Sequence, residues 1–146
     1  MKKYLTQTIA IMMFVAAVTI TAEAQASSAK EMQARIPFAF NVGSKTLPAG
    51  EYTVKVINPN ADRSVLQIRS KDGRLSALVQ TNGAKSDNAD AAKLVFHRYG
   101  ETYYFVQAQM AGDSTALAAV KSSAQRNKEH ELALNVTKST VAIRAE

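Results

Sequence analysis

One stretch of the sequence decides the fold class: Thr46-Leu47-Pro48-Ala49-Gly50-Glu51-Tyr52-Thr53-Val54-Lys55-Val56. The ring of Pro48 fixes φ near the value that the second residue of a type I turn requires, and Gly50 is expected to follow it in the left-handed region. The residues after the turn alternate between an apolar set and a polar set, which is typical of a strand with one face on a core and one face in water. The stretch therefore predicts a turn that leads directly into a strand of an antiparallel sheet.

The residues before this turn also show strand spacing. Ile36, Phe38 and Phe40 share one face of residues 35–40. Pro37 has no N–H to donate, so we expect this strand to lie at an edge or to turn that nitrogen out of the sheet. A tight turn is expected over residues 41–45, because Gly43 adopts a positive φ at little cost. Residues 27–34 are predicted to be a flexible lead-in.

Two hairpins are predicted downstream. Strands over Val65–Ser70 and Leu75–Thr81 flank the turn residues 71–74, and residues 82–92, which lack periodicity, are expected to form the longest loop. The clearest hairpin joins residues 93–99 to residues 102–108 through Gly100-Glu101, a two-residue loop that suits a type II′ turn. That turn fixes the register and places the following residues opposite one another: Tyr99 and Thr102, Arg98 and Tyr103, His97 and Tyr104, Phe96 and Phe105, Val95 and Val106. Because both faces are partly apolar, the hairpin is expected to be central or covered by another element.

The expected cover is a helix over about residues 115–134. Asp113 or Ser114 can cap its start, and Leu117, Val120 and Ala124 recur at helical spacing. A break near Lys121 would divide it into two shorter pieces. Residues 135–146 are predicted to form either a closing strand or a frayed tail. Residues 35–146 are thus expected to form one mostly antiparallel β domain of about six to eight short strands, a small barrel or a sandwich, with one late helix.

The N-terminus has the pattern of a cleaved signal peptide. Lys2 and Lys3 precede an apolar run over residues 9–20, which is too short to span a bilayer comfortably, and small-residue cleavage patterns follow. We expect removal of residues 1–26, although cleavage two residues earlier also fits, and no transmembrane segment in the mature chain. The protein is therefore predicted to be exported, either to the periplasm or to the medium.

Composition narrows the chemistry. The chain has no cysteine, so disulfides, thiol catalysis and thiolate metal sites are excluded. The net charge is +6 for the whole chain and about +5 once Lys2, Lys3 and Glu23 are removed with the signal peptide. This basic charge favours acidic partners outside the cytoplasm, such as anionic glycans or lipid headgroups, whereas export makes nucleic acid an improbable partner. The basic residues are scattered along the sequence, which is also typical of an ordinary charged surface.

An ordered set of motifs carries a resemblance to a known family. The motifs are residues 36–43 (Ile-Pro-Phe-Ala-Phe-Asn-Val-Gly), residues 47–54 (Leu-Pro-Ala-Gly-Glu-Tyr-Thr-Val), the hairpin over residues 66–81 and residues 94–100 (Leu-Val-Phe-His-Arg-Tyr-Gly). Together they resemble a family of small, uncharacterised exported proteins abundant in acidobacteria, over roughly residues 35–110. The resemblance implies export and a shared β fold, and it assigns no activity and no site.

The candidate binding residues lie on the clearest hairpin. His97, Arg98, Tyr103 and Tyr104 gather aromatic and cationic groups there and could bind a ligand, or His97 could act as an acid or base. The alternative is that the histidine simply bonds to its tyrosine neighbour. His130 lies in a charged run and is expected to be solvated.

Metal and nucleophile patterns are missing. Asp87, Asn88 and Asp90 lack the order of a calcium loop, and two distant histidines do not predict a zinc site. No serine lies in a G-x-S-x-G or S-x-x-K pattern, and no nucleotide-binding glycine motif occurs. No cofactor is expected.

Three functional hypotheses follow. The first is a non-enzymatic envelope or secreted module that binds an unidentified, possibly anionic ligand near His97, Arg98, Tyr103 and Tyr104. The second is a small periplasmic hydrolase or isomerase that uses His97 with Asp87 or Asp90. The third is a structural domain that associates through an exposed sheet edge. A membrane barrel is disfavoured, because Glu51, Thr53 and Lys55 make one strand face too polar for lipid.

Overall fold

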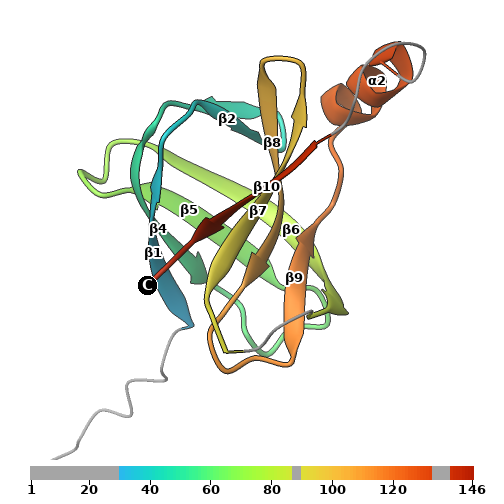
Figure 1. Cartoon of the computed structure of the whole chain (residues 1–146). Coiled ribbons are helices and arrows are strands. Elements are labelled where there is room, and N and C mark those ends of the chain that lie inside the picture. The colour runs from blue at the N-terminus through green and yellow to red at the C-terminus, as the bar shows by residue number, and fades with distance from the viewer. Residues whose placement is uncertain (1–29, 87–89, 133–138) are drawn as a thin grey trace, which may run out of the picture.

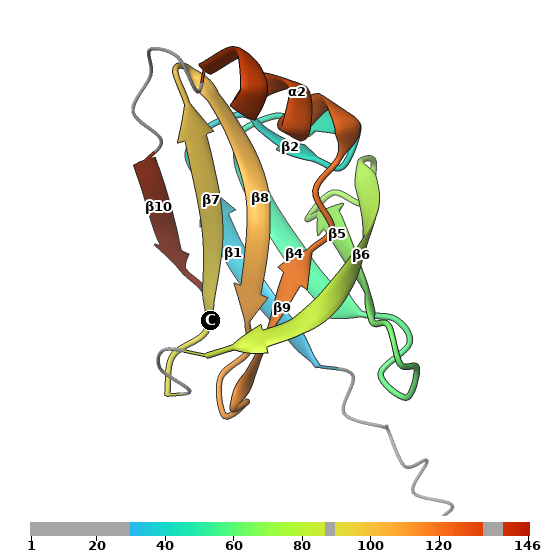
Figure 2. The same cartoon turned by 90° about the vertical axis from the view of Figure 1, so that its right-hand side faces the viewer.

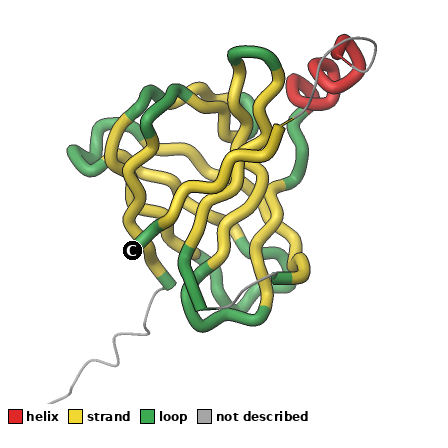
Figure 3. The backbone as a smooth tube through the Cα atoms, in the orientation of Figure 1, coloured by secondary structure: helices red, strands yellow, loops and turns green. Residues whose placement is uncertain are grey.

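The computed structural model describes residues 30–86, 90–132 and 139–146, and within them ten strands form one sheet with a single helix at one end (Figure 1). The elements are β1 (Glu31–Ile36), β2 (Phe40–Val42), β3 (Lys45–Leu47), β4 (Gly50–Val56), β5 (Val65–Ser70), β6 (Ser76–Lys85), β7 (Lys93–Tyr99), β8 (Thr102–Gln109), β9 (Thr115–Ala119), α2 (Ser123–Leu132) and β10 (Ser139–Arg144). The turns and loops gather at the two ends of the strands (Figure 3).

The sheet is mixed but almost entirely antiparallel. Its order is β1-β4-β5-β6-β9-β8-β2-β3, with β7 on the other edge of β8 and β10 on the far edge of β7. Only the short pairing of β2 with β8 is parallel. The prediction of a mostly antiparallel β fold with one late helix is therefore confirmed. The strand number was too low, and the alternatives of a barrel or a sandwich are both corrected: there is one curved sheet, and it is not closed.

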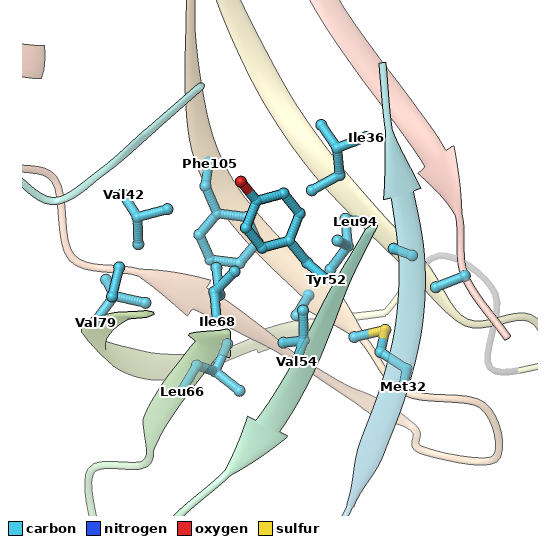
Figure 4. Packing of buried hydrophobic residues seen from close by; sticks show 14 of the residues in the cluster. Met32, Ile36, Val42, Tyr52, Val54, Leu66, Ile68, Val79, Leu94 and Phe105 are labelled. Atoms are coloured by element: carbon cyan, nitrogen blue, oxygen red, sulfur yellow. The ribbon is translucent and has the colours of Figure 1, made fainter. Parts of the chain in front are cut away.

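The core lies inside this curvature. Tyr52, Val54 and Val56 are at most 4% exposed, as their alternation predicts, and they face apolar side chains of β1, β5, β7 and β8 (Figure 4). Phe96 lies fully buried among Phe38, Phe40 and Phe105, with ring centroids 5.2–5.9 Å apart in edge-to-face geometry. Packing of alternating strand residues thus supplies the stability that a cysteine-free chain needs.

The opening in the sheet lies between β1 and β10, and we call it the seam. At its closed end the Gln33 N–H donates to the Glu146 carbonyl at 2.7 Å, and the Glu146 N–H donates to the Gln33 carbonyl at 2.9 Å. Antiparallel continuation of this pair would place Arg35 directly opposite Arg144, and Pro37 beyond them has no N–H to donate. Like charges directly opposite destabilise strand pairing, which explains why the sheet stops closing here.

Reversing one of these charges is expected to extend the pairing. Arg144→Glu would face Arg35 across the seam and Lys93 across β7, so it should raise the free energy of unfolding by about 0.5–1 kcal/mol. Urea unfolding and hydrogen exchange at the Arg35 amide would measure the effect. Arg144→Gln, which removes repulsion without adding attraction, is the control. Lower stability for Arg144→Glu than for Arg144→Gln would contradict this account.

The turn before β4 differs from its prediction in one respect. Gly50 does not have a positive φ; it is the first residue of β4 and pairs with Ile36. The turn is instead held by the Tyr52 hydroxyl, which donates to the Pro48 carbonyl at 2.6 Å. Gly43 does adopt the left-handed conformation expected of it, with φ of 60°.

The N-terminal part of the domain is more regular than predicted. Residues 31–34, placed in a flexible lead-in, begin β1, and Met32 and Ala34 are buried against the core. Pro37 does not sit inside a strand; it separates β1 from β2, while Asn41 and Val42 extend β2 rather than forming a turn. Before Ile36 only Met32 and Ala34 are apolar, which is too few residues to indicate a buried strand from the sequence.

The segment between β8 and α2 corrects two linked predictions. Residues 115–119 form β9 rather than the start of a helix, and they pair with residues 81–85 of β6, of which residues 82–85 were expected to be loop. The helix begins only at Ser123, where the Ser122 hydroxyl accepts a hydrogen bond from the Gln125 N–H at 3.1 Å, so Ser122 is the cap instead of Asp113 or Ser114. An alanine-rich segment fits either conformation, and pairing with β6 and β8 selected the strand.

Residues 139–144 form strand β10, which was one of the two alternatives predicted for residues 135–146; residues 135–138 lie outside the described residues. The predicted signal peptide and its cleavage sites lie outside the described residues. Within the described part of the chain, no helix has both the length and the apolar character needed to cross a membrane.

Candidate functional site

The β7–β8 hairpin positions all four candidate residues. Gly100 has φ of 61° and no other residue of the loop has a positive φ, which agrees with the predicted type II′ turn. The pairs from Tyr99 and Thr102 to Phe96 and Phe105 have the predicted register. The prediction fails at Val95, which pairs with Gln107 instead of Val106, because an irregularity between Val95 and Phe96 shifts the register.

The four candidate residues divide between two faces of this hairpin. Arg98 and Tyr103 lie on the same face as Phe96, at the hairpin end. Tyr103 stacks on Phe38 with centroids 3.9 Å apart, and the Arg98 guanidinium lies 5.6 Å from the Tyr103 ring centroid. Arg98 also donates to the Gly100 carbonyl at 2.7 Å and to the Glu101 carboxylate at 2.9 Å. This pair is therefore engaged in holding the turn and closing one end of the core.

His97 and Tyr104 lie on the outer face. Tyr104 is 8% exposed and meets the Tyr99 ring edge-on at 5.8 Å, and His97 approaches the same ring at 6.3 Å. The structure thus does not bring the four candidates into one site. Of the four, His97 alone lines a groove on this outer face.

Helix α2 is fixed over Tyr99 by polar groups. The Tyr99 hydroxyl donates to the Glu129 carboxylate, and the Lys121 ammonium bonds to both oxygens of that carboxylate at 2.9 Å. Burial, followed by the bond to Glu129, raises the pKa of Tyr99 to about 12. We call Tyr99, Lys121 and Glu129 the polar latch. The helix therefore covers the second face of the hairpin only at its Tyr99 end.

A groove opens beside the latch because β8 changes partners along one edge. Tyr103 and Tyr104 pair with β2, whereas Gln107 and Ala108 pair with β9, so β9 diverges from β8 beyond this point. Figure 2 shows β10, β7, β8 and β9 next to one another. The outer groove over these strands has a volume of about 440 Å³ and extends to Lys121. Its lining comprises Lys93, Val95, His97, Val106, Gln107, Ala118, Ala119, Lys121, Thr140 and Ala142.

The lining is basic and partly apolar. Lys93 and Lys121 supply ammonium groups, His97 lies between apolar neighbours, and the described lining contains no carboxylate. Glu129 contacts Lys121 from the helix side. Sequence reasoning missed both lysines: Lys93 could have been found because it shares the face of His97 in an alternating strand, whereas Lys121 was hidden within the wrongly extended helix.

Catalytic and metal-binding arrangements gain no support among the described residues. No group of three histidine or acidic side chains there could hold a metal ion. Asp87 and Asn88 lie outside the described residues, and Asp90 is exposed near the Lys93 end of β7, while about 13 Å of strand separates Lys93 from His97. His130 is exposed in the last turn of α2, as expected.

No family model, curated protein or solved structure matches the chain. The outer groove, with its charge and shape, is therefore the basis for a functional assignment.

Proposed function

We propose that the protein is an exported, non-enzymatic β domain that binds an anionic, partly apolar ligand in the outer groove. The observation that carries this proposal is a groove of about 440 Å³ that is lined by Lys93, His97 and Lys121, with no carboxylate among its described lining residues. That volume falls within the range of small-molecule sites.

The shape of the groove restricts its ligand. Lys93 and Lys121 come from opposite ends, and the surface between them is formed by small or branched apolar side chains: Val95, Val106, Ala118 and Ala142. A flat apolar body would replace water on this floor, and an anionic group would meet an ammonium group at an end. Thr140 and Gln107 offer further hydrogen bonds.

Export is part of the same proposal. The basic n-region and short apolar run before residue 27 support it, and so does the resemblance to small exported proteins of acidobacteria. The site of action is the periplasm, the cell envelope or the medium. In such compartments the acidic ligands available include glycans and lipid headgroups, and nucleic acid is not expected as a partner.

The proposal is tested with an anionic, flat aromatic probe, 8-anilinonaphthalene-1-sulfonate. We expect saturable binding to the folded mature chain, measured by fluorescence titration. Lys93→Gln and Lys121→Gln should each weaken binding about threefold, and the double variant about tenfold, because each removes one partly exposed ionic contact. Lys55→Gln is the matched control, since Lys55 is half-buried on β4 and lies outside the groove.

A second variant separates the groove from nonspecific dye binding. Ala118→Phe would fill the floor of the groove without changing charge, and it should abolish saturable binding while urea unfolding stays cooperative. Equal affinities for the wild type, Ala118→Phe and the double lysine variant would overturn the proposed site. The hydrolase or isomerase hypothesis, which needs a carboxylate beside His97, has no described geometry in its favour and stays a prediction.

A further inference from the structure

The seam leaves one edge of β10 without a strand partner in the described structure. Glu146 directs its N–H and carbonyl to Gln33, whereas the Ala145 N–H donates to the Ala92 carbonyl on the β7 side. Because alternate residues of a strand direct these groups to the same side, Thr140, Ala142 and Arg144 present theirs to the open edge. On the other side of the seam, the backbone N–H and carbonyl of Arg35 in β1 also point to the open edge.

The charges around the seam are unevenly paired. A pocket of about 290 Å³ here is lined by residues of β1 and β4, by Lys71, and by Arg144 and Glu146. Lys71 is bound to Glu51 at 2.5 Å. Arg35 and Arg144 make no ion pair or side-chain hydrogen bond with another described residue, and Arg35 acts on Glu51 only through a weaker Coulomb interaction. The side chains of the pocket thus carry three positive charges, on Arg35, Lys71 and Arg144, and two negative charges, on Glu51 and Glu146.

We propose that the seam binds an extended acidic segment of another protein, which adds as a further strand to the free edge of β10 at Thr140 and Ala142, beyond the end where β10 meets β1, and places a carboxylate against Arg144 and Arg35. This site is distinct from the outer groove. The strand would satisfy the outward backbone groups of Thr140 and Ala142, and its acidic side chain would relieve the repulsion between Arg35 and Arg144.

Two features of β10 favour strand addition at this edge. Its sequence, Ser-Thr-Val-Ala-Ile-Arg, is rich in β-branched residues and contains no proline, so it lacks a common protection of edge strands. Its one charged residue, Arg144, is attractive to an acidic segment and repulsive to a basic one. A second copy of this chain is a poorer occupant, because it would bring another Arg144 and a net charge of +6.

The probe for this site is a capped seven-residue peptide in which glutamate and valine alternate. We expect it to bind the mature chain by isothermal titration and to shift the amide signals of Thr140, Ala142 and Arg144. The same peptide N-methylated at alternate residues, on the edge that faces β10, should bind at least tenfold more weakly, because its charge is unchanged but its ladder hydrogen bonds are blocked. A peptide with lysine in place of glutamate should not bind.

Protein variants test the charges and separate this site from the outer groove. Arg144→Glu should abolish peptide binding and Arg35→Gln should weaken it severalfold, whereas Arg63→Gln, at an exposed arginine outside the pocket, should not change it. Lys121→Gln should bind the peptide normally, because Lys121 lies at the end of the outer groove away from Arg144, so failure of the groove proposal leaves this one intact. Equal binding of the N-methylated peptide, or a concentration-dependent dimer that Ala142→Pro dissolves, would overturn it.

Discussion

Replacing Phe96 with alanine is expected to lower the free energy of unfolding by about 3–5 kcal/mol, which is a large part of the stability of a domain of this size. The Phe96 ring is fully buried and meets Phe38, Phe40 and Phe105 edge-on. These rings come from three segments, so the substitution removes contacts that join β7 to β8, to β2 and to the β1–β2 connection. The cavity left behind cannot be refilled by a neighbouring ring without breaking another contact.

Urea unfolding followed by circular dichroism would measure this loss. Leu78→Ala is the control, because Leu78 is 58% exposed on the outer face of β6, and its removal should change stability by no more than about 0.5 kcal/mol. If Phe96→Ala does not accumulate in a folded form, Phe96→Leu, with a smaller expected loss, provides the measurement. A loss below about 1 kcal/mol for Phe96→Ala would contradict the packing described for this ring.

Sequence reasoning succeeded where local geometry decides the structure. The bounds of β5 and β7 were predicted to the residue, and the register of the β7–β8 hairpin followed from its two-residue turn from Phe96 to Phe105. A turn of fixed length leaves no freedom in the pairing beside it. The register prediction failed only beyond the irregularity at Val95, because no residue type in the sequence indicates an irregularity at that position.

Sequence reasoning failed where contacts between distant segments decide the structure. Thr115–Ala119 contains three alanines and a leucine, and only the vacant edges of β6 and β8 make it a strand. Met32 and Ala34 alternate with polar residues, but too few apolar residues mark β1 as buried. The hydrophobic pattern also could not predict that the sheet stays open. Arg35 and Arg144 are found opposite one another only when β1 and β10 are placed side by side.

The candidate site was predicted only in part, because its position also depends on contacts between distant segments. The hairpin pairs Arg98 with Tyr103 and His97 with Tyr104, as expected, and strand alternation then places the two pairs on opposite faces. The groove that His97 lines depends on Lys121, and the position of Lys121 follows from where β9 ends and α2 begins. Only His97 therefore remains from the predicted set in the proposed groove.

Replacing Tyr99 with phenylalanine is expected to destabilise the domain by about 1–3 kcal/mol near pH 8 and by progressively less as the pH rises above 10. At pH 8 the Tyr99 hydroxyl donates to Glu129, and phenylalanine cannot. The pKa of this tyrosine is raised from its ordinary value of 10.0 to about 12, mainly by burial and then by that bond. A raised folded-state pKa gives a stabilisation that is complete below the unfolded value and disappears as the pH rises through the folded value.

The magnitude follows from the same pKa values. At pH 11 the wild type should have lost roughly 1.4 kcal/mol through this group, so the difference between the wild type and Tyr99→Phe should shrink by about that amount between pH 8 and pH 11. Other tyrosines and lysines titrate over this range in both proteins, and their contributions cancel in the comparison. Urea unfolding of both proteins at several pH values would measure it.

Glu129→Gln tests which part of the polar latch is responsible. The amide still accepts a hydrogen bond but carries no charge, so the pH dependence assigned to Tyr99 should diminish without disappearing, because burial is the larger cause of the raised pKa. The variant also frees the Lys121 ammonium from its carboxylate, which should strengthen probe binding in the outer groove. If the wild type and Tyr99→Phe lose stability in parallel from pH 8 to pH 11, the Tyr99 hydroxyl is not held against Glu129. In that case α2 does not fix Lys121 at the end of the groove, and the anionic end of the ligand must instead be recognised by Lys93.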